Sequence, residues 1–133
     1  MATFKRFEDI IAWQKARKLC KLIKVYTDHA VSSKDFKRLS QINGSAGSAM
    51  DNIAEGFERG GNKEFIQFLF ISEGSDGEVR SPLYRALDNK YISEKEFREA
   101  YDLAYEVGKL DRGLISYLKE SELKEINLKS KKV

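Results

Sequence analysis

The chain has 133 residues, of which 41% are hydrophobic and 34% are charged, a balance typical of one folded, helix-rich domain rather than of a disordered segment. A single proline and a single cysteine exclude collagen-like, proline-rich and disulfide-stabilised proteins. The formal net charge of +3 is too small to define a nucleic-acid-binding protein by charge alone.

Four amphipathic helices are predicted, over residues 7–28, 34–58, 63–88 and 94–118. In each of them apolar residues recur at spacings of three and four, which places them on one face of a helix. In the first helix the recurring residues are Ala12, Ala16, Leu19, Ile23 and Tyr26.

The boundaries of these helices are marked by residues that cap helix ends. Ser32 with Asp35, and Ser93 with Glu96, have the spacing of capping boxes ahead of the second and fourth helices. The Gly-Gly-Asn segment 60–62 ends the second helix through glycine and can cap the third through its asparagine.

Pro82 lies inside the third predicted helix, where it removes a backbone donor, so we expect a kink or break near residues 78–81. No segment alternates polar and apolar residues with a period of two, so no sheet is expected. The fold class predicted is therefore all-α: an antiparallel up-down four-helix bundle over residues 1–118. A polar, partly disordered tail is expected over residues 119–133.

No segment has the ~20 apolar residues that a membrane span requires, and the N-terminus lacks the apolar stretch of a signal peptide. Cys20 has no partner in the chain, so we expect a reduced, buried thiol. These features predict a cytoplasmic protein that does not associate with membranes.

Small residues are concentrated in segments 43–49 and 74–77. A hairpin that turns near residue 61 places Gly47 opposite Ser75, so the two segments are expected to face one another. Because a glycine inside a helix costs roughly 1 kcal/mol relative to alanine, the segments predict close helix–helix contact. The alternative is a groove lined by backbone, but the Lys-Ser/Thr ending of a phosphate-binding loop is missing.

The segment 65–71 carries apolar side chains around the whole circumference of the third helix, with Gln67 as the single polar gap. A lone bundle leaves one side of each helix in water, so this segment predicts a homo-oligomer; the alternative is a monomer with a broad apolar surface. The predicted interface residues are Ile66, Phe70, Tyr101 and Tyr105.

Residues typical of catalysis are sparse. The single histidine, His29, is expected to end the first helix, and no Glu-x-x-His pair, zinc-ligand spacing or serine triad accompanies it. The carboxylates near the small-residue segments are interpreted as helix caps and ion pairs, with Glu55 and Arg59 at the favourable i, i+4 spacing. We therefore expect a protein without enzymatic activity, metal or cofactor.

The first helix carries the predicted basic surface. Arg17, Lys21 and Lys24 form one stripe, with Lys18 beside it and Lys15 on the same helix. Phosphate contacts of this kind supply affinity and salt dependence but little sequence specificity. The candidate nucleic-acid-binding residues are therefore Lys15, Arg17, Lys18, Lys21 and Lys24, and the alternative is an ordinary solvated helix face.

Residues 52–59, Asn-Ile-Ala-Glu-Gly-Phe-Glu-Arg, are followed by Glu-Phe-Ile-Gln-Phe-Leu at 64–69 and Glu-Gly-Ser at 73–75. In this order and spacing the sequence resembles the four-helix-bundle protein family, also called the 23S ribosomal RNA intervening-sequence protein family, over about residues 4–118. The resemblance implies an up-down four-helix bundle, often assembled as a ring-like homopentamer, with no established catalytic residues. It also implies a structural role for the shared residues Asn52, Glu55, Gly56, Arg59, Glu64, Phe68, Gly74, Ser75 and Glu78.

The sequence departs from that family at two places. Basic residues usual near Asn43 and Gly44 are absent, which weakens a nucleic-acid surface on the second helix, and Pro82 interrupts a helix that is usually unbroken. The function predicted is a non-enzymatic homopentameric bundle that scaffolds or accompanies a nucleic-acid process, such as one involving ribosomal RNA. The alternative is a structural oligomer that binds itself or another protein and no nucleic acid.

Overall fold

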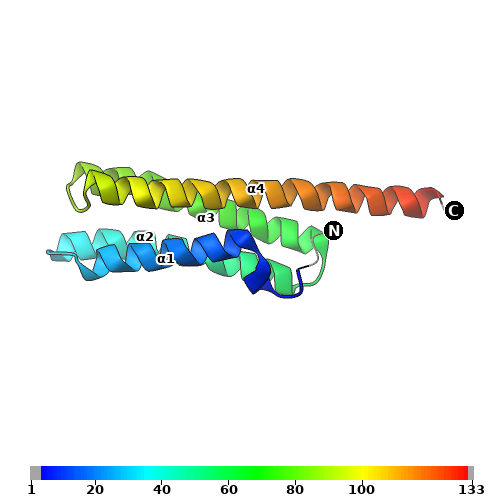
Figure 1. Ribbon diagram of the computed structural model, residues 1–133, viewed down its shortest axis with the longest axis horizontal. Coiled ribbons are helices and arrows are strands. Elements are labelled where there is room, and N and C mark those ends of the chain that lie inside the picture. The colour runs from blue at the N-terminus through cyan, green and yellow to red at the C-terminus, as the bar shows by residue number, and fades with distance from the viewer. Residues whose placement is uncertain (1–3, 132–133) are drawn as a thin grey trace.

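The computed structural model describes residues 4–131. These residues form a short 3-10 helix, η1 (Phe7–Asp9), and four α-helices: α1 (Ile11–Asp28), α2 (Ser33–Glu58), α3 (Asn62–Asp88) and α4 (Glu94–Lys131). The helices lie side by side, with the α1–α2 and α3–α4 connections at one end and the α2–α3 connection at the other (Figure 1). α2 packs against α1 and α3, and α4 packs against α3 and α1, which closes the bundle. The all-helical fold class is confirmed.

The predicted capping residues are found at the starts of α2 and α4. Ser32 Oγ accepts a hydrogen bond from the Asp35 N–H at 3.1 Å at the start of α2. At α4 the capping box is complete, because Ser93 and Glu96 each donate a backbone N–H to the other's side chain. The end of α2 uses Gly60 with φ of +86°, a conformation that favours glycine. Asn62 differs from its expected role, since it is the first residue of α3 and Gly61 occupies the N-cap position.

α3 is one continuous helix across Pro82, so the expected break near residues 78–81 is absent. Proline removes one backbone donor, which is a local loss. Val79, Leu83 and Ala86 are buried on either side of it in the core of the bundle. Their packing holds the helix together across the missing hydrogen bond.

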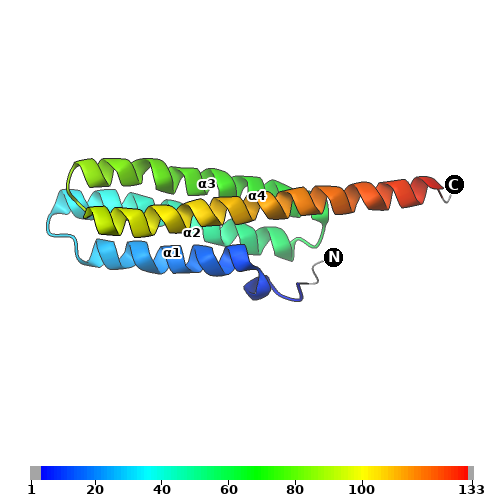
Figure 2. The same ribbon diagram turned by 45° about the horizontal axis from the view of Figure 1, so that its top comes forward.

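α4 also differs from its expected length, because it continues to Lys131 instead of ending near Leu118. Leu118 is the last fully buried residue, and beyond it the helix projects past the other three (Figure 2). The projecting segment holds no glycine or proline, and it spaces Glu120 from Lys124 and Glu125 from Lys129 in the favourable i, i+4 order. The sequence pattern therefore located the end of the core rather than the end of the helix.

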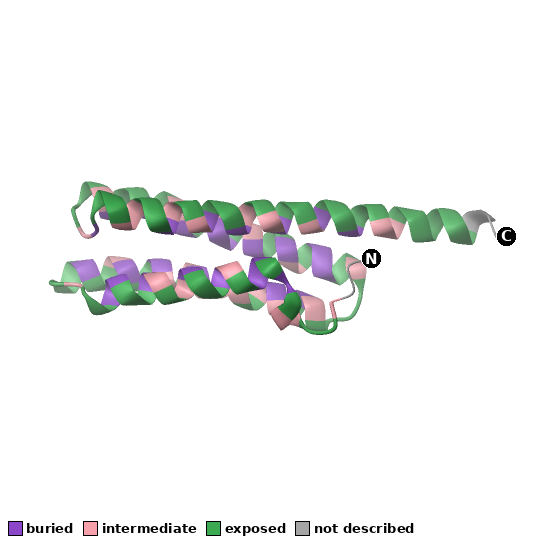
Figure 3. Ribbon diagram, viewed as in Figure 1, coloured by how far each residue is buried: buried purple, intermediate pink, exposed green. Residues whose placement is uncertain are grey.

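The core consists of two apolar clusters, one toward each end of the bundle, on the inward helix faces (Figure 3). The first contains residues such as Leu19, Leu39 and Leu83, and the second contains residues such as Ile53 and Leu69. Along α3, the buried polar residues Ser72, Ser75 and Asp76 fall between the two clusters. A polar layer therefore crosses the middle of the core.

The small-residue segments of α2 and α3 face one another as predicted, since Ser48 Oγ lies 3.0 Å from Ser75 Oγ. The predicted reason is wrong for their glycines, however. A Cβ built at Gly44, Gly47, Gly74 or Gly77 meets no atom within 4 Å, so these four glycines border open space. The close helix contact is at Gly56, where an added Cβ lies 2.6 Å from the Phe68 Cβ and 3.1 Å from the Phe65 ring.

Replacement of Gly56 by alanine is expected to destabilise the protein by roughly 1–3 kcal/mol, because the added methyl group overlaps Phe68. Gly47→Ala is the matched control, since it adds a methyl group in open space and removes a helix-interior glycine, which stabilises by up to about 1 kcal/mol. Urea denaturation followed by circular dichroism measures both changes. A Gly56→Ala protein as stable as the wild type would contradict the close contact, because it would show that α2 and α3 accommodate the methyl group without loss of free energy of unfolding.

Candidate functional site

The five predicted nucleic-acid-binding residues all lie on α1, but most of them have partners within the chain. Lys15 pairs with Glu106 of α4 at 3.4 Å, and Lys24 pairs with Asp28 one turn further on. The Arg17 guanidinium lies 5.8 Å from the centre of the Trp13 ring. Of the five, Lys18 and Lys21 are exposed and have no partner among the described residues. The basic surface on α1 is therefore narrower than the sequence indicates.

The predicted interface residues lie on α3 and α4, and three of them share one face. Phe70 is 39% exposed and Tyr105 is 52% exposed, whereas Tyr101 is half-buried. Ile66 differs from expectation, since it is 8% exposed and packs in the chain's own core beside Leu69. Its face of α3 is the one covered by the bundle, so it has little surface to offer a second copy.

Aromatic rings and cations alternate along this α3–α4 face. Tyr84 and Phe97 pack against Tyr101, with ring centres 5.5 and 5.4 Å away, respectively. The Arg80 guanidinium lies 5.9 Å from the ring centres of both Tyr101 and Tyr105. Phe70 lies beneath Arg112 at 5.3 Å and Lys119 at 5.1 Å. We call the set Phe70, Tyr84, Phe97, Tyr101 and Tyr105 the aromatic face.

A hollow of about 520 Å³ between α3 and α4 adjoins the aromatic face and is lined by Phe70, Tyr105, Gly108 and several charged groups. Two of its three cations are paired with carboxylates. Arg112 donates two hydrogen bonds to Glu73, at 2.9 and 2.6 Å, and Arg80 Nε lies 3.5 Å from Asp76 Oδ2. The hollow therefore combines aromatic surface with two ion pairs and with Lys109, whose ammonium lies 5.9 Å from the Tyr105 ring centre.

Asp76 and Asp111 form the centre of the buried polar layer and are 1% and 0% exposed. Burial raises the pKa of Asp111 to about 7, against the opposing effect of its hydrogen bond to Ser72. Burial also raises the pKa of Asp76 to about 7, although Arg80 acts to lower it. Gly108 makes room for Asp76, since an added Cβ would lie 2.9 Å from Asp76 Oδ2. The sequence pattern does not bring this pair together, although Asp76 and Asp111 occupy core-facing positions of the helical repeat.

Ser72 links the layer to α2, because its Oγ lies 2.8 Å from the Ala49 carbonyl oxygen and 2.7 Å from Asp111 Oδ2. A hydroxyl group has one proton to donate. When Asp111 is protonated, its O–H donates to Ser72 Oγ and Ser72 donates to Ala49. When Asp111 is ionised, Ser72 donates to the carboxylate and the link to Ala49 is lost. The protonated acid therefore joins α4, α3 and α2 in one chain of hydrogen bonds.

Between the unfolded pKa of Asp, ~3.9, and the folded pKa of about 7, the folded protein holds more protons than the unfolded chain. The free energy of unfolding is therefore expected to fall as the pH rises through this window. Asp111→Asn supplies a neutral donor at every pH, so it is expected to stabilise the protein at pH ~8 by on the order of 2 kcal/mol and to reduce the pH dependence to the part that Asp76 contributes.

Asp102→Asn, an exposed aspartate on the same helix, is the control for these measurements of urea midpoint against pH. A wild-type protein whose stability rises between about pH 5 and pH 7, with Asp111→Asn less stable at pH ~8, would contradict a protonated Asp111.

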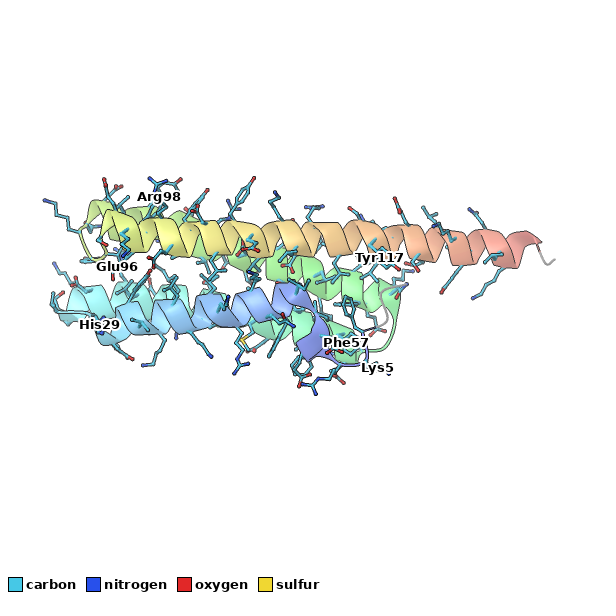
Figure 4. The ribbon with its side chains drawn as sticks, viewed as in Figure 1. Lys5, His29, Phe57, Glu96, Arg98 and Tyr117 are labelled. Carbon is cyan, nitrogen blue, oxygen red and sulfur yellow. The ribbon has the colours of Figure 1, made fainter. Side chains whose placement is uncertain are left out.

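Two residues considered for chemistry lie apart from this layer. His29 is exposed at the C-cap of α1, at the same end of the bundle as Glu96 (Figure 4). Cys20 is half-buried rather than buried, and burial, with Asp51 nearby, raises the pKa of its thiol to about 11, which leaves little thiolate at neutral pH. Within residues 4–131, no group of three or more His, Cys, Asp or Glu side chains could hold a metal ion.

The family-motif residues divide into two groups. The Asn52 amide donates to the Ser48 carbonyl at 2.8 Å, Glu55 pairs with Arg59 at 2.9 Å, and Arg59 lies over the Phe68 ring. Asn52 and Glu55 make contacts within α2, whereas Arg59, Gly56 and Ser75 take part in contacts between α2 and α3. Glu64, Gly74 and Glu78, in contrast, are exposed on α3.

The four packed helices, the close contact at Gly56 and the motif residues on α2 and α3 define a small helical-bundle protein. The model of the 23S rRNA-intervening sequence protein family matches residues 8–113, most of the chain, and the protein belongs to this family. Its fold is similar to the crystal structure of a protein of unknown function from the S23 ribosomal protein family of Bacteroides thetaiotaomicron. The two chains are 24% identical with a TM-score of 0.70, over 82% of this chain and 96% of that one. No curated protein matches the sequence.

None of the helices within residues 4–131 combines the length and apolar character needed to span a membrane.

Proposed function

We propose that this chain is the antiparallel, up-down protomer of a homo-oligomer, a pentameric ring, that accompanies a nucleic-acid process and carries out no catalysis itself. The observation that carries the proposal is the aromatic face, where Phe70, Tyr84 and Tyr105 are all exposed on α3 and α4. Exposed aromatics gathered on one face are typical of protein interfaces.

The cations on this face favour burial against a second copy. Arg80 and Arg112 are already paired with carboxylates, and their guanidinium planes rest on aromatic rings. An interface formed here covers few uncompensated charges, which limits the cost of removing water. The open glycines of α2 and α3 and the paired cations of α1 offer no comparable apolar surface.

Phe70→Glu is expected to reduce the native mass toward that of a monomer, because it places a carboxylate within the proposed interface and removes a ring packed by Arg112. We expect the association constant to fall by at least about tenfold. Sedimentation velocity at several protein concentrations measures the change.

Phe36→Glu is the matched control, since Phe36 is an exposed phenylalanine on α2, outside the aromatic face. Equal native masses for the wild type and both variants would contradict the proposed interface. A folded bundle, verified by circular dichroism, is required of each variant.

Nucleic acid is proposed to contact the exposed cations of α1, where Lys18 and Lys21 have no carboxylate partner among the described residues. An oligomer repeats these cations around the assembly, and repeated weak phosphate contacts add in affinity. The second candidate function, a structural oligomer without nucleic acid, is favoured by the ion pairs that already occupy Lys15 and Lys24.

Lys18→Gln/Lys21→Gln is expected to weaken binding of a ribosomal RNA fragment at low salt and to reduce the salt slope of binding by about one per lost phosphate contact. Lys124→Gln/Lys129→Gln on the projecting part of α4 removes the same charge and serves as control. RNA cosedimentation at protein and nucleic-acid wavelengths distinguishes the two functions: an oligomer that ignores RNA supports the second.

A further inference from the structure

A second hollow, of about 400 Å³, lies at the end of the bundle where the α1–α2 and α3–α4 connections meet. Its lining combines the start of α2 with the α3–α4 connection: Lys34, Lys37, Arg38, Gln41 and Tyr91. Its volume is within the range of small-ligand sites in proteins. Neither the family match nor the proposed function assigns a role to it.

The three cations of this hollow share one side of α2. Lys34 precedes Lys37 by three residues and Arg38 by four, so it lies next to both on the helix surface. None of them forms an ion pair or a side-chain hydrogen bond with another described residue. Like charges at this spacing repel one another, so the protein keeps the cluster at a cost to its own stability.

The charge of this hollow is uncompensated, and this separates it from the α3–α4 hollow. There, Arg112 pairs with Glu73 and Arg80 with Asp76, and Lys109 is the one lining cation without a carboxylate partner among the described residues. Here, none of the described lining residues carries a carboxylate, and the remaining lining groups, Gln41 and Tyr91, have side chains that can donate hydrogen bonds. A concave site of one charge sign concentrates ions of the opposite sign.

The wall formed by Tyr91 is held in place by its backbone. The Tyr91 N–H donates to the Ala86 carbonyl at 2.9 Å and the Lys90 N–H to the Leu87 carbonyl at 3.0 Å, the hydrogen-bond pattern that ends many helices. Lys90 takes the left-handed conformation, with φ of +61°, which usually requires glycine. The Tyr91 side chain also packs against the first apolar cluster, so the hollow has one rigid wall.

We propose that this hollow is a binding site for a phosphate group, held by Arg38 with Lys34 and Lys37. The half-buried Arg38 supplies a planar pair of donors that matches two phosphate oxygens, and the lysines supply the balancing charge. The phosphate can belong to a free phosphorylated compound or to the end of a nucleic-acid strand. The site is separate from the α1 surface and does not depend on it.

The test is a titration of the full chain with inorganic pyrophosphate, followed by thermal unfolding and calorimetry, with sodium chloride at matched ionic strength as the reference. Binding to the folded state is expected to raise the melting temperature beyond the chloride reference. Lys34→Gln/Arg38→Gln is expected to weaken pyrophosphate binding by at least about tenfold. Lys18→Gln/Lys21→Gln, which removes the same charge from α1, is expected to change it by less than about twofold.

Absence of pyrophosphate binding by the wild type, or equal losses in the two double variants, would overturn the site, because equal losses indicate a diffuse effect of net charge. Arg38→Lys keeps the charge and loses the paired donors, so it provides a variant with little risk to folding. We expect it to weaken binding several-fold, and unchanged binding would overturn the role given to Arg38.

A second arm separates the two sources of the phosphate. A short RNA with a 5′-phosphate is compared with the same RNA carrying a 5′-hydroxyl, by fluorescence anisotropy. Tighter binding of the phosphorylated strand that is lost in Lys34→Gln/Arg38→Gln supports a strand end as the ligand. Equal binding of the two strands alongside tight pyrophosphate binding supports a free phosphorylated compound. Loss of RNA binding in Lys18→Gln/Lys21→Gln alone concerns the α1 surface and leaves the pyrophosphate result unaffected.

Discussion

The hydrogen bonds of Asp111 in the middle of the bundle constrain the packing of three helices at once. A carboxyl group with no exposed surface is costly unless it is neutral or fully partnered. Ser72 gives it a partner on α3 and extends the contact to the Ala49 carbonyl on α2. An apolar pattern with spacings of three and four is nearly repeated by a shift of seven residues, so apolar packing alone discriminates weakly between registers. A shift of α4 along α3 would separate Asp111 from Ser72 and Asp76 from Gly108, so the polar layer favours the observed alignment.

The glycines of α2, α3 and α4 show that one residue type takes different roles in the same bundle. Gly56 is required by a close contact with Phe68, and Gly108 is required by the space that Asp76 occupies. Gly44, Gly47, Gly74 and Gly77 border open space, so neither contact nor backbone conformation requires them. The family motif includes Gly56, which a close contact requires, and Gly74, which borders open space. Packing within one chain therefore does not explain every residue that the sequence shares with the family.

The placement of charge gives the surface its organisation. Arg80 and Arg112 on the α3–α4 face are paired with carboxylates and lie against aromatic rings, so that face combines apolar surface with ion pairs. Two lysines of α1 and the three cations at the start of α2 have no such partners among the described residues. The net charge of +3 does not show this difference between paired and unpaired cations, because it sums the charges of both regions. The uncompensated regions are the ones for which we propose phosphate contacts.

The sequence by itself determined the helices, because spacing, capping and glycine positions are local: Ser32, Ser93 and Gly60 act on the residues next to them. It also placed Ser75 opposite the 43–49 segment, since a short turn leaves little choice of register. Only the tertiary structure decided which charges are neutralised, as in Lys15 with Glu106, and which side of the 65–71 segment is covered, as in Ile66. It alone revealed that Asp76 and Asp111 share one buried layer and that Lys34, Lys37 and Arg38 meet Tyr91 around a hollow. These features depend on distances between residues far apart in the chain, and a periodic pattern contains no information about which distant residue lies across a helix interface.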